Sequence, residues 1–166
     1  MTPPLESALR IDPATEQDVP TLVALIRALA EYERLADEMI ADDARLHESL
    51  FGAHPAAEAV IARIGDEAVG FAIWFHNYST FLGRRGLYLE DLFVKSEFRS
   101  KGVGRALLQH LAQVALDRNC GRLEWSVLDW NETAIGFYES LGARGLDEWT
   151  IFRLQGDALA RLARGR

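Results

Sequence analysis

The segment Arg99–Gly104, which reads Arg-Ser-Lys-Gly-Val-Gly, has the composition of an anion-binding turn. It follows the apolar run 87–94 and precedes apolar residues at helical spacing. Glycines at such a junction let a ligand approach the backbone closely. The first N–H groups of a helix lack internal partners, and the helix dipole is positive there. With Arg99, Lys101 and Arg105 adding charge, the segment predicts a cradle for a phosphate or pyrophosphate.

A glycine turn of this kind is also compatible with simpler structures. An ordinary tight turn with a solvated basic rim would have the same composition. The segment lacks the terminal Gly-Lys-Ser/Thr of a P-loop. It also lacks the Gly-x-Gly-x-x-Gly spacing of a Rossmann dinucleotide site. The prediction of an anion site therefore needs support from a second motif.

Residues 131–143 supply that second motif. Asn131 is a good N-cap and Gly142 a plausible residue just after the last turn, so a short helix is predicted between them. Ala134 and Tyr138 are four apart and share one face of that helix. The small alanine would leave room for a ligand, and the tyrosine would present its hydroxyl beside it. Taken alone, Tyr138 would be interpreted as a packed aromatic residue with a hydrogen-bonded hydroxyl.

Together, Arg-x-x-Gly-x-Gly and Asn-x-x-Ala-x-x-x-Tyr-x-x-x-Gly resemble the two coenzyme A motifs of the GNAT superfamily of N-acetyltransferases, in the family's order. The resemblance implies the α/β GNAT fold, a single mixed and mostly antiparallel central sheet flanked by helices. It also implies acetyl-CoA as co-substrate, with no metal.

The likeness extends from about Leu9 to the end of the chain and is strongest with the diamine (spermidine/spermine) N-acetyltransferase branch. Within that branch, residues 78–80, 127–131 and 154–156 look most similar to the thialysine N-acetyltransferases. Ser79 stands where the polyamine-specific members have an aspartate for the distal ammonium. Its presence favours a lysine-like amine over a long polyamine. The segments that carry the branch resemblance are 30–33, 51–55, 88–91, 99–104, 129–131 and 137–138.

Two adjacent carboxylates, Glu90 and Asp91, interrupt an otherwise apolar run. Strand alternation puts them on opposite faces unless a bulge intervenes. A charge in a buried strand is costly, so at least one should face a cleft or a partner. The residues alone leave a solvated edge or a structural salt bridge equally open. The resemblance implies that Glu90 is the base, acting through ordered water, that Asp91 attracts the cationic substrate, and that Tyr138 protonates the leaving thiolate.

The resemblance also implies which residues contact each substrate. Backbone N–H groups of the central strand would receive the acetyl group and the pantetheine where that strand splays from its neighbour. Asp147 is a further acidic candidate, and its place in the pocket stays open. The expected coenzyme contacts are Leu92, Phe93, Val94, Arg99, Ser100, Lys101, Gly102, Val103, Gly104, Arg105, Asn131, Thr133, Ala134 and Tyr138. The expected amine contacts are Tyr32, Glu33, Glu90, Asp91, Glu124, Trp125 and Ser126.

The bulk composition narrows the class of protein. The 166 residues carry a net charge of −7, which disfavours nucleic-acid binding and suits cationic substrates. A single cysteine, Cys120, forms no internal disulfide and fits a reducing compartment. No apolar run approaches the roughly 20 residues of a membrane span, and residues 1–6 do not resemble a signal peptide. The histidines have no metal-ligand spacing. We expect a cytoplasmic protein without a metal, a nucleic-acid partner or a membrane partner.

The length of 166 residues predicts one domain, over residues 8–166, after a loose N-terminus at residues 1–7. A capping box at Thr15 should precede the first main helix. Residues 77–86, rich in Ser, Thr, Gly and Arg, are expected to form a loop. The expected strands are 8–12, 58–64, 69–76, 87–94, 122–128 and 148–154, and the expected helices are 20–33, 42–51, 102–118, 131–141 and 157–162.

Three functions fit these observations. The favoured one is transfer of an acetyl group from acetyl-CoA to the primary amine of a small cationic substrate, a thialysine- or lysine-like amine or a diamine or polyamine, directly within a ternary complex. The alternatives are a protein lysine or N-terminal acetyltransferase and a non-catalytic acyl-CoA-binding sensor module. The resemblance further implies a homodimer.

Overall fold

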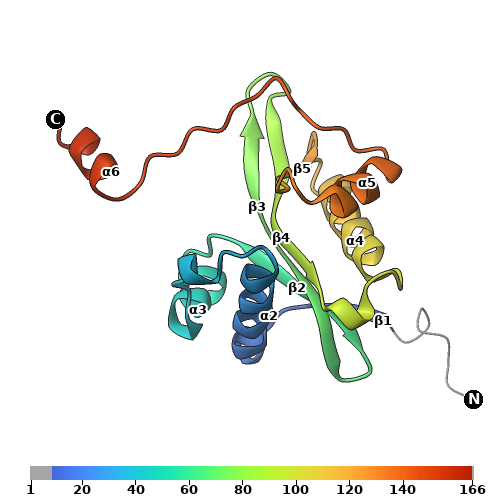
Figure 1. Cartoon of the computed structure of the whole chain (residues 1–166). Coiled ribbons are helices and arrows are strands. Elements are labelled where there is room, and N and C mark those ends of the chain that lie inside the picture. The colour runs from blue at the N-terminus through green and yellow to red at the C-terminus, as the bar shows by residue number, and fades with distance from the viewer. Residues whose placement is uncertain (1–8, 166) are drawn as a thin grey trace, which may run out of the picture. The chain divides into compact units, whose positions relative to one another are not determined.

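The computed structural model describes residues 9–165 (Figure 1), so the loose N-terminus expected at residues 1–7 lies outside them. The chain divides into two compact units, one ending at Ser126 and the other beginning at Val127. The sheet and most of the expected site belong to the first unit. The expectation of one domain over residues 8–166 stays a prediction.

A five-stranded sheet in the order β1-β2-β3-β4-β5 forms the centre of the first unit. Neighbouring strands run antiparallel except for β4 and β5, which run parallel. The predicted mixed, mostly antiparallel sheet is therefore confirmed. The strands are β1 (Leu9–Pro13), β2 (Glu58–Ile64), β3 (Glu67–Ser79), β4 (Arg84–Val94) and β5 (Leu123–Trp125).

Helices lie on both sides of this sheet (Figure 1). The first unit contains α2 (Val19–Tyr32), α3 (Asp43–Phe51) and α4 (Val103–Asp117), together with short 3-10 helices at Glu16–Asp18, Ala36–Glu38 and Ser96–Phe98. The second unit contains α5 (Glu132–Ser140) and α6 (Gly156–Ala163).

The predicted helix starts are confirmed by their caps. The carboxylate of Asp18 accepts hydrogen bonds from the backbone N–H and the hydroxyl of Thr15, both at 2.9 Å, just before α2. Asp42 caps α3 by accepting from the N–H of Arg45 at 2.8 Å. These local bonds satisfy helix-terminal donors, which is why short sequence signals predicted the starts within a residue or two.

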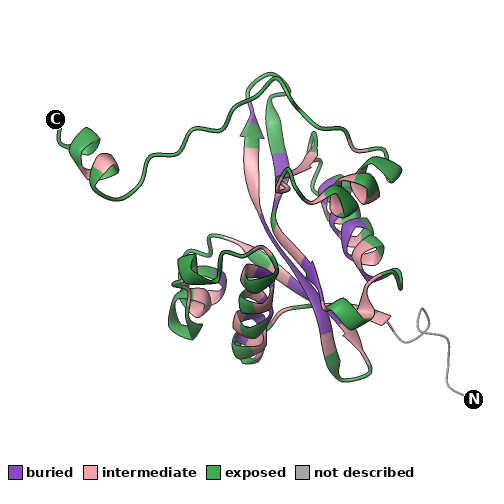
Figure 2. Cartoon of the chain, viewed as in Figure 1, coloured by how far each residue is buried: buried purple, intermediate pink, exposed green. Residues whose placement is uncertain are grey.

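Buried residues lie on the sheet and on the helices that flank it (Figure 2), and the apolar ones form two sets, one on each face of the sheet. On one face, α2 and α3 pack against alternate residues of the strands. On the other face, α4 packs against β4, β3 and β1. The first set is Leu22, Leu25, Leu29, Leu50, Ile61, Phe71, Ile73 and Phe93. The buried residues of α4 are Val103, Leu107, Leu108, Leu111 and Ala115.

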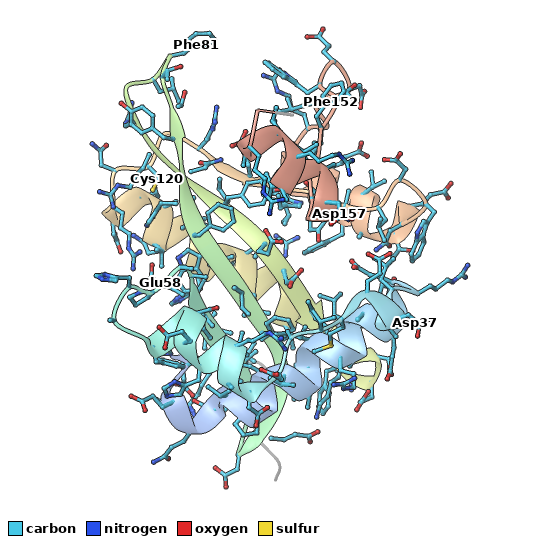
Figure 3. All side chains as sticks on the ribbon, turned by 90° about the vertical axis from the view of Figure 1, so that its left-hand side faces the viewer. Asp37, Glu58, Phe81, Cys120, Phe152 and Asp157 are labelled. Carbon is cyan, nitrogen blue, oxygen red and sulfur yellow. The ribbon has the colours of Figure 1, made fainter. Side chains whose placement is uncertain are left out.

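The loop expected at residues 77–86 is wrong. β3 and β4 continue through it as a hairpin in which Asn77 pairs with Gly86 and Ser79 with Arg84. The turn is confined to residues 80–83, where the side chain of Phe81 is 99% exposed (Figure 3). Polar and glycine residues are typical of loops, but pairing with a neighbouring strand overrides that composition.

Two other strand predictions are corrected. β5 contains Leu123–Trp125 alone, shorter than the expected 122–128. Residues 148–154 of the second unit form no strand among the residues described, and Trp149, Ile151 and Phe152 are exposed. The apolar pattern at 148–154 suits a strand, but a strand forms only where a partner ladder is available.

The fully buried Leu22 gives a test of this packing. Leu22→Ala should lower the free energy of unfolding by about 2–5 kcal/mol, because it removes buried methyl groups and leaves a cavity between α2 and the sheet. Urea denaturation followed by circular dichroism measures the change. The matched control is Leu116→Ala on α4, since Leu116 is 74% exposed. Equal losses in the two variants would contradict the assigned core.

Candidate active site

The expected anion cradle forms the turn between β4 and α4. Gly102 caps α4 with a φ of 84°, a backbone conformation that disfavours residues with a Cβ. Ser100, in the same turn, also has a positive φ, of 59°. The helical ladder begins when the N–H of Ala106 donates to the carbonyl of Gly102 at 2.9 Å. The preceding N–H groups at the start of α4 can therefore donate to an anion.

Arg99 fastens this turn to the rest of the first unit. Its Nε donates to the carbonyl oxygen of Val94 at 2.9 Å. Its guanidinium lies over the ring of Tyr32, 4.3 Å from the centroid, and 5.5 Å from the centroid of Phe93. A residue expected at the coenzyme thus contacts a residue expected at the amine. Arg99 links the two halves of the predicted site.

The central strand continues beyond its parallel partner. β5 pairs with β4 from Leu87 to Leu89 and ends there. The following stretch, with Leu92, Phe93 and Val94, is paired with β3 on one side. No strand among residues 9–165 pairs with it on the other side. An unpaired strand edge presents backbone N–H groups that could donate hydrogen bonds to a ligand, as the expected splay requires.

A β-bulge at Glu90 decides how the two carboxylates are presented. Asp91 pairs with Ile73 and Leu89 pairs with Trp74, so Glu90 is an extra residue on β4. Ile73 belongs to the core beneath α2, and paired residues share a face of the sheet. Asp91 therefore lies on the α2 face, and the bulged Glu90 is exposed.

The acidic groups around the bulge influence one another. Burial, and then the negative charges of Glu90 and Glu33, raise the pKa of Asp91 to about 6. Burial also raises the pKa of Glu33, which caps the end of α2 beside Tyr32. The structure thus brings together Glu33, Glu90 and Asp91, three of the expected amine contacts. A cation placed among them would relieve this repulsion.

Two further expected amine contacts, Glu124 and Ser126, lie beside Tyr88 on the same face of the sheet. Tyr88 pairs with Phe75 on one side and Glu124 on the other, and its ring is 5.2 Å from that of Phe75. Because the bulge shifts the alternation by one residue, Tyr88 and Asp91 share the α2 face although they are three apart. The Tyr88 hydroxyl lies 2.8 Å from the hydroxyl of Ser126.

Trp125 is placed differently from its neighbours. It pairs with Leu89, which alternates with Tyr88 and so lies on the α4 side of the sheet. The structure therefore does not bring the Trp125 side chain to the face that carries Glu124 and Ser126.

Sequence reasoning missed three residues on this face: Asn77, Tyr88 and Arg122. Asn77 donates through Nδ2 to Oε2 of Glu124 at 3.0 Å, and Nε of Arg122 lies 2.7 Å from the same oxygen. Asn77 lies in the segment 77–86, for which the sequence composition predicts a loop and so no residue on a face of the sheet. The sequence does contain a signal, which is spacing by two residues along a strand. Arg122 and Glu124 are two apart, as are Phe75 and Asn77, so each pair would share one face of the sheet.

Ser79, interpreted as a specificity marker, has a structural role in the hairpin. Its side chain is buried, and its hydroxyl accepts a hydrogen bond from the N–H of Leu82 at 3.2 Å. The bond closes the β3–β4 turn. The face near this turn consequently carries no carboxylate at position 79.

The second unit positions the remaining motif on α5. Asn131 caps this helix, its Oδ1 accepting from the N–H of Ala134 at 3.3 Å. Gly142 follows the last turn with a φ of 90°, as the sequence predicted. Thr133, Ala134 and Tyr138 lie on α5, and the Tyr138 ring is 5.6 Å from that of Phe137.

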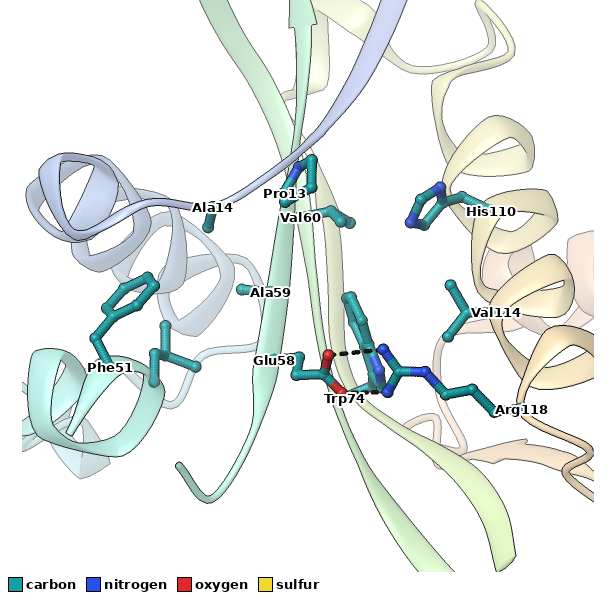
Figure 4. A pocket seen from close by; sticks show the side chains of 11 residues that line it. Pro13, Ala14, Phe51, Glu58, Ala59, Val60, Trp74, His110, Val114 and Arg118 are labelled. Carbon is teal, nitrogen blue, oxygen red and sulfur yellow. Dashed lines mark hydrogen bonds and ion pairs between the residues drawn. The ribbon is translucent and has the colours of Figure 1, made fainter. Parts of the chain in front are cut away.

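A cavity of about 240 Å³ lies elsewhere, between α3, β2 and α4 (Figure 4). Glu58 and Arg118 form an ion pair across it through both carboxylate oxygens, beside Trp74 and His110. None of the expected site residues lines this cavity. Its ion pair joins β2 to α4 and is separate from the acidic site at the bulge.

Within residues 9–165, no group of three or more histidine, cysteine, aspartate or glutamate side chains is arranged to hold a metal ion. No helix in this described part is both long and apolar enough to span a membrane.

Comparison with known sequences identifies relatives over nearly the whole chain. A thialysine N-epsilon-acetyltransferase of Bos taurus is 39% identical over 161 residues, covering 90% of this chain and 94% of the relative. An L-ornithine N5-acetyltransferase of Arabidopsis thaliana is 32% identical, covering 90% and 86%. The likeness to the thialysine enzymes predicted from the sequence is confirmed.

Comparison with solved structures agrees. An integron cassette protein from the mobile metagenome of V. cholerae superposes with a TM-score of 0.80 at 31% identity, covering 95% of this chain and 98% of that one. A metagenomic aminoglycoside acetyltransferase, at 19% identity and a TM-score of 0.77, shares the fold. The model of the Acetyltransferase (GNAT) family matches residues 22–143. With the two motifs and the mixed sheet in place, the chain belongs to the GNAT family of N-acetyltransferases.

Proposed function

We propose that this protein transfers the acetyl group of acetyl-CoA to the primary amine of a small cationic substrate, a lysine-like amine or a diamine. The observation that carries the proposal is the acidic group Glu33, Glu90 and Asp91 beside the open edge of β4. A site built from carboxylates favours a cation. The named activities of the relatives, on thialysine and L-ornithine, support an amine acceptor of this size.

Acetyl-CoA would bind with its pyrophosphate on the turn before α4. The conformations of Ser100 and Gly102 and the free N–H groups at the start of α4 support this assignment. Lys101 and Arg105 would add charge. The pantetheine and acetyl group would lie along Leu92, Phe93 and Val94 of β4, with Asn131, Thr133 and Ala134 of α5 contributing to the coenzyme site.

The reaction would proceed directly in a ternary complex. A water-mediated proton transfer to Glu90 frees the amine lone pair, which attacks the thioester carbonyl. The carbon–sulfur bond then breaks, the Tyr138 hydroxyl gives its proton to the thiolate, and the second proton lost by the new amide nitrogen returns to the tyrosine oxygen. Backbone N–H groups on the open edge of β4 would stabilise the oxyanion. Asp91 holds the incoming ammonium and makes no covalent bond.

The assembly and location of the enzyme are part of the same proposal. We propose a cytoplasmic homodimer, with the C-terminal part contributing to the interface. The free Cys120 is compatible with a reducing compartment. The exposed apolar side chains of Trp149, Ile151 and Phe152 are compatible with an interface in the C-terminal part.

Release of free thiol from acetyl-CoA tests the function. The panel is thialysine, lysine, ornithine, putrescine, spermidine and spermine. Turnover with lysine-like amines is expected. Coenzyme binding without thiol release from any amine would overturn the proposal in favour of a protein acceptor or a sensor.

Tyr138→Phe tests the acid. Removing the hydroxyl should lower kcat by about 100-fold or more, because the thiolate would leave unprotonated. The dissociation constant of acetyl-CoA, measured by calorimetry, should change by less than about twofold, since the ring remains in place. Phe137→Leu, on the same helix, is the control. Wild-type turnover in Tyr138→Phe would remove Tyr138 from this role.

The raised pKa of Asp91 predicts a pH dependence. Its pKa of about 6 means that the carboxylate is charged above that pH and neutral below it. Because the substrate amine stays protonated throughout this range, kcat/KM should fall as the pH decreases through about 6, through a rise in KM. Asp91→Asn should remove that inflection while lowering kcat/KM at neutral pH. An unchanged inflection in Asp91→Asn would assign it to another group.

A further inference from the structure

The ion pair between Arg122 and Glu124 has unused hydrogen-bonding capacity. Nε of Arg122 lies 2.7 Å from Oε2 of Glu124, and Asn77 donates to that same oxygen. Among the interactions of the described residues, none uses Oε1 of Glu124 or the two terminal nitrogens of Arg122. The side chains are 39% and 27% exposed. A ligand could therefore reach a paired donor fork and a carboxylate oxygen at once.

The pair lies on the face of the sheet that carries the acidic site. Glu124 is beside Tyr88 on the α2 face, and Arg122 is two residues before it. The space over Gly86 confirms this, because a Cβ there would lie 3.2 Å from Cγ of Arg122 and 2.2 Å from Oδ1 of Asn77. Gly86 has no side chain, so Arg122 and Asn77 can fold over β4.

The separation between the pair and Asp91 suits a small substrate. Tyr88 and Asp91 are three residues apart on β4, about 7–10 Å along a strand with one bulge. An extended lysine side chain spans roughly 6–7 Å from its amine to its α-carbon, from ordinary bond lengths. A substrate whose amine lies at Asp91 would place its other end beside Glu124 and Arg122.

We propose that the Arg122–Glu124 pair recognises the α-amino-acid head group of the acceptor, which makes Arg122 a specificity-determining residue. The α-carboxylate would accept from the terminal nitrogens of Arg122, and the α-ammonium would donate to Oε1 of Glu124. This inference rests on the proposed function and adds a substrate class to it: a basic amino acid is preferred over the diamine that lacks its carboxylate. In a diamine the distal ammonium would meet Arg122, and the two positive charges would repel.

A structural salt bridge is the competing explanation. An exposed pair of this kind contributes little to stability, and it would act on all substrates alike. Recognition of the head group instead changes the ratio between two substrates that differ by one carboxylate. That ratio distinguishes the two explanations.

The experiment compares L-lysine, lysinamide and cadaverine as acceptors. Lysinamide keeps the α-ammonium and has no carboxylate, and cadaverine has neither group on an α-carbon. In the wild-type enzyme kcat/KM should be about 10- to 100-fold higher for lysine than for cadaverine, the range expected for charge-assisted hydrogen bonds, with lysinamide well below lysine. Arg122→Gln should abolish the advantage of lysine over cadaverine, mainly through KM.

Controls separate this role from misfolding. Arg84→Gln removes another β4-region arginine, which binds Asn119, and should leave the lysine-to-cadaverine ratio unchanged. Glu124→Gln should weaken lysine and lysinamide together. Lysine binding measured by calorimetry with coenzyme A present should weaken about 10-fold or more in Arg122→Gln, independently of turnover.

The outcomes are distinct. Equal losses for lysine and cadaverine in Arg122→Gln, or equal wild-type use of the two, would overturn the head-group assignment while leaving the acetyltransferase intact. Wild-type enzyme that acetylates none of the three amines would instead overturn the proposed function. In that case unchanged lysine binding in Arg122→Gln would overturn the head-group site as well.

Discussion

The single extra residue in β4 governs the layout of the acceptor side. Without the bulge at Glu90, Tyr88 and Asp91 would lie on opposite faces of the sheet, and Asp91 would point away from α2. With it, Tyr88, Asp91 and Phe93 share one face, and Glu90 is exposed. A strand that is paired on both sides could not use its backbone for ligands. β5 ends opposite Leu89, next to the bulge, so the irregular residue and the open edge coincide.

Arg99 ties the coenzyme turn to this arrangement. Its bond to the carbonyl of Val94 fixes the turn to the end of β4, and its position over Tyr32 fixes the end of α2 to the turn. On the same face of the sheet, burial and then the negative charges of Glu90 and Glu33 raise the pKa of Asp91. The amine substrate would supply the charge that balances this group. Binding of the amine would therefore also relieve the repulsion among these carboxylates.

The two ends of the proposed acceptor site, both on the α2 face of the sheet, differ in charge. Arg122 neutralises one oxygen of Glu124, so the far end of the face is a zwitterion, whereas the end near Asp91 is acidic. This asymmetry would orient a substrate that has an amine at one end and an amino-acid head group at the other. Position 79 also carries no carboxylate that would bind a second ammonium group. Its residue, Ser79, closes the hairpin turn instead.

The sequence by itself determined the features that depend on local chemistry. The capping box at Thr15, the cap at Asn131 and the two motifs around Gly102 and Tyr138 depend on residue types at fixed spacing, and the resemblance of those two motifs to the GNAT motifs predicted the family and the mixed sheet. Tertiary structure decided what depends on pairing between distant segments. The bulge at Glu90, the hairpin through 77–86 and the face shared by Asp91 and Glu124 arise from register between strands, which no single segment encodes. Composition cannot reveal that Asn77 and Arg122 both contact Oε2 of Glu124 beside Gly86, because these contacts are made only when distant segments are aligned in the sheet.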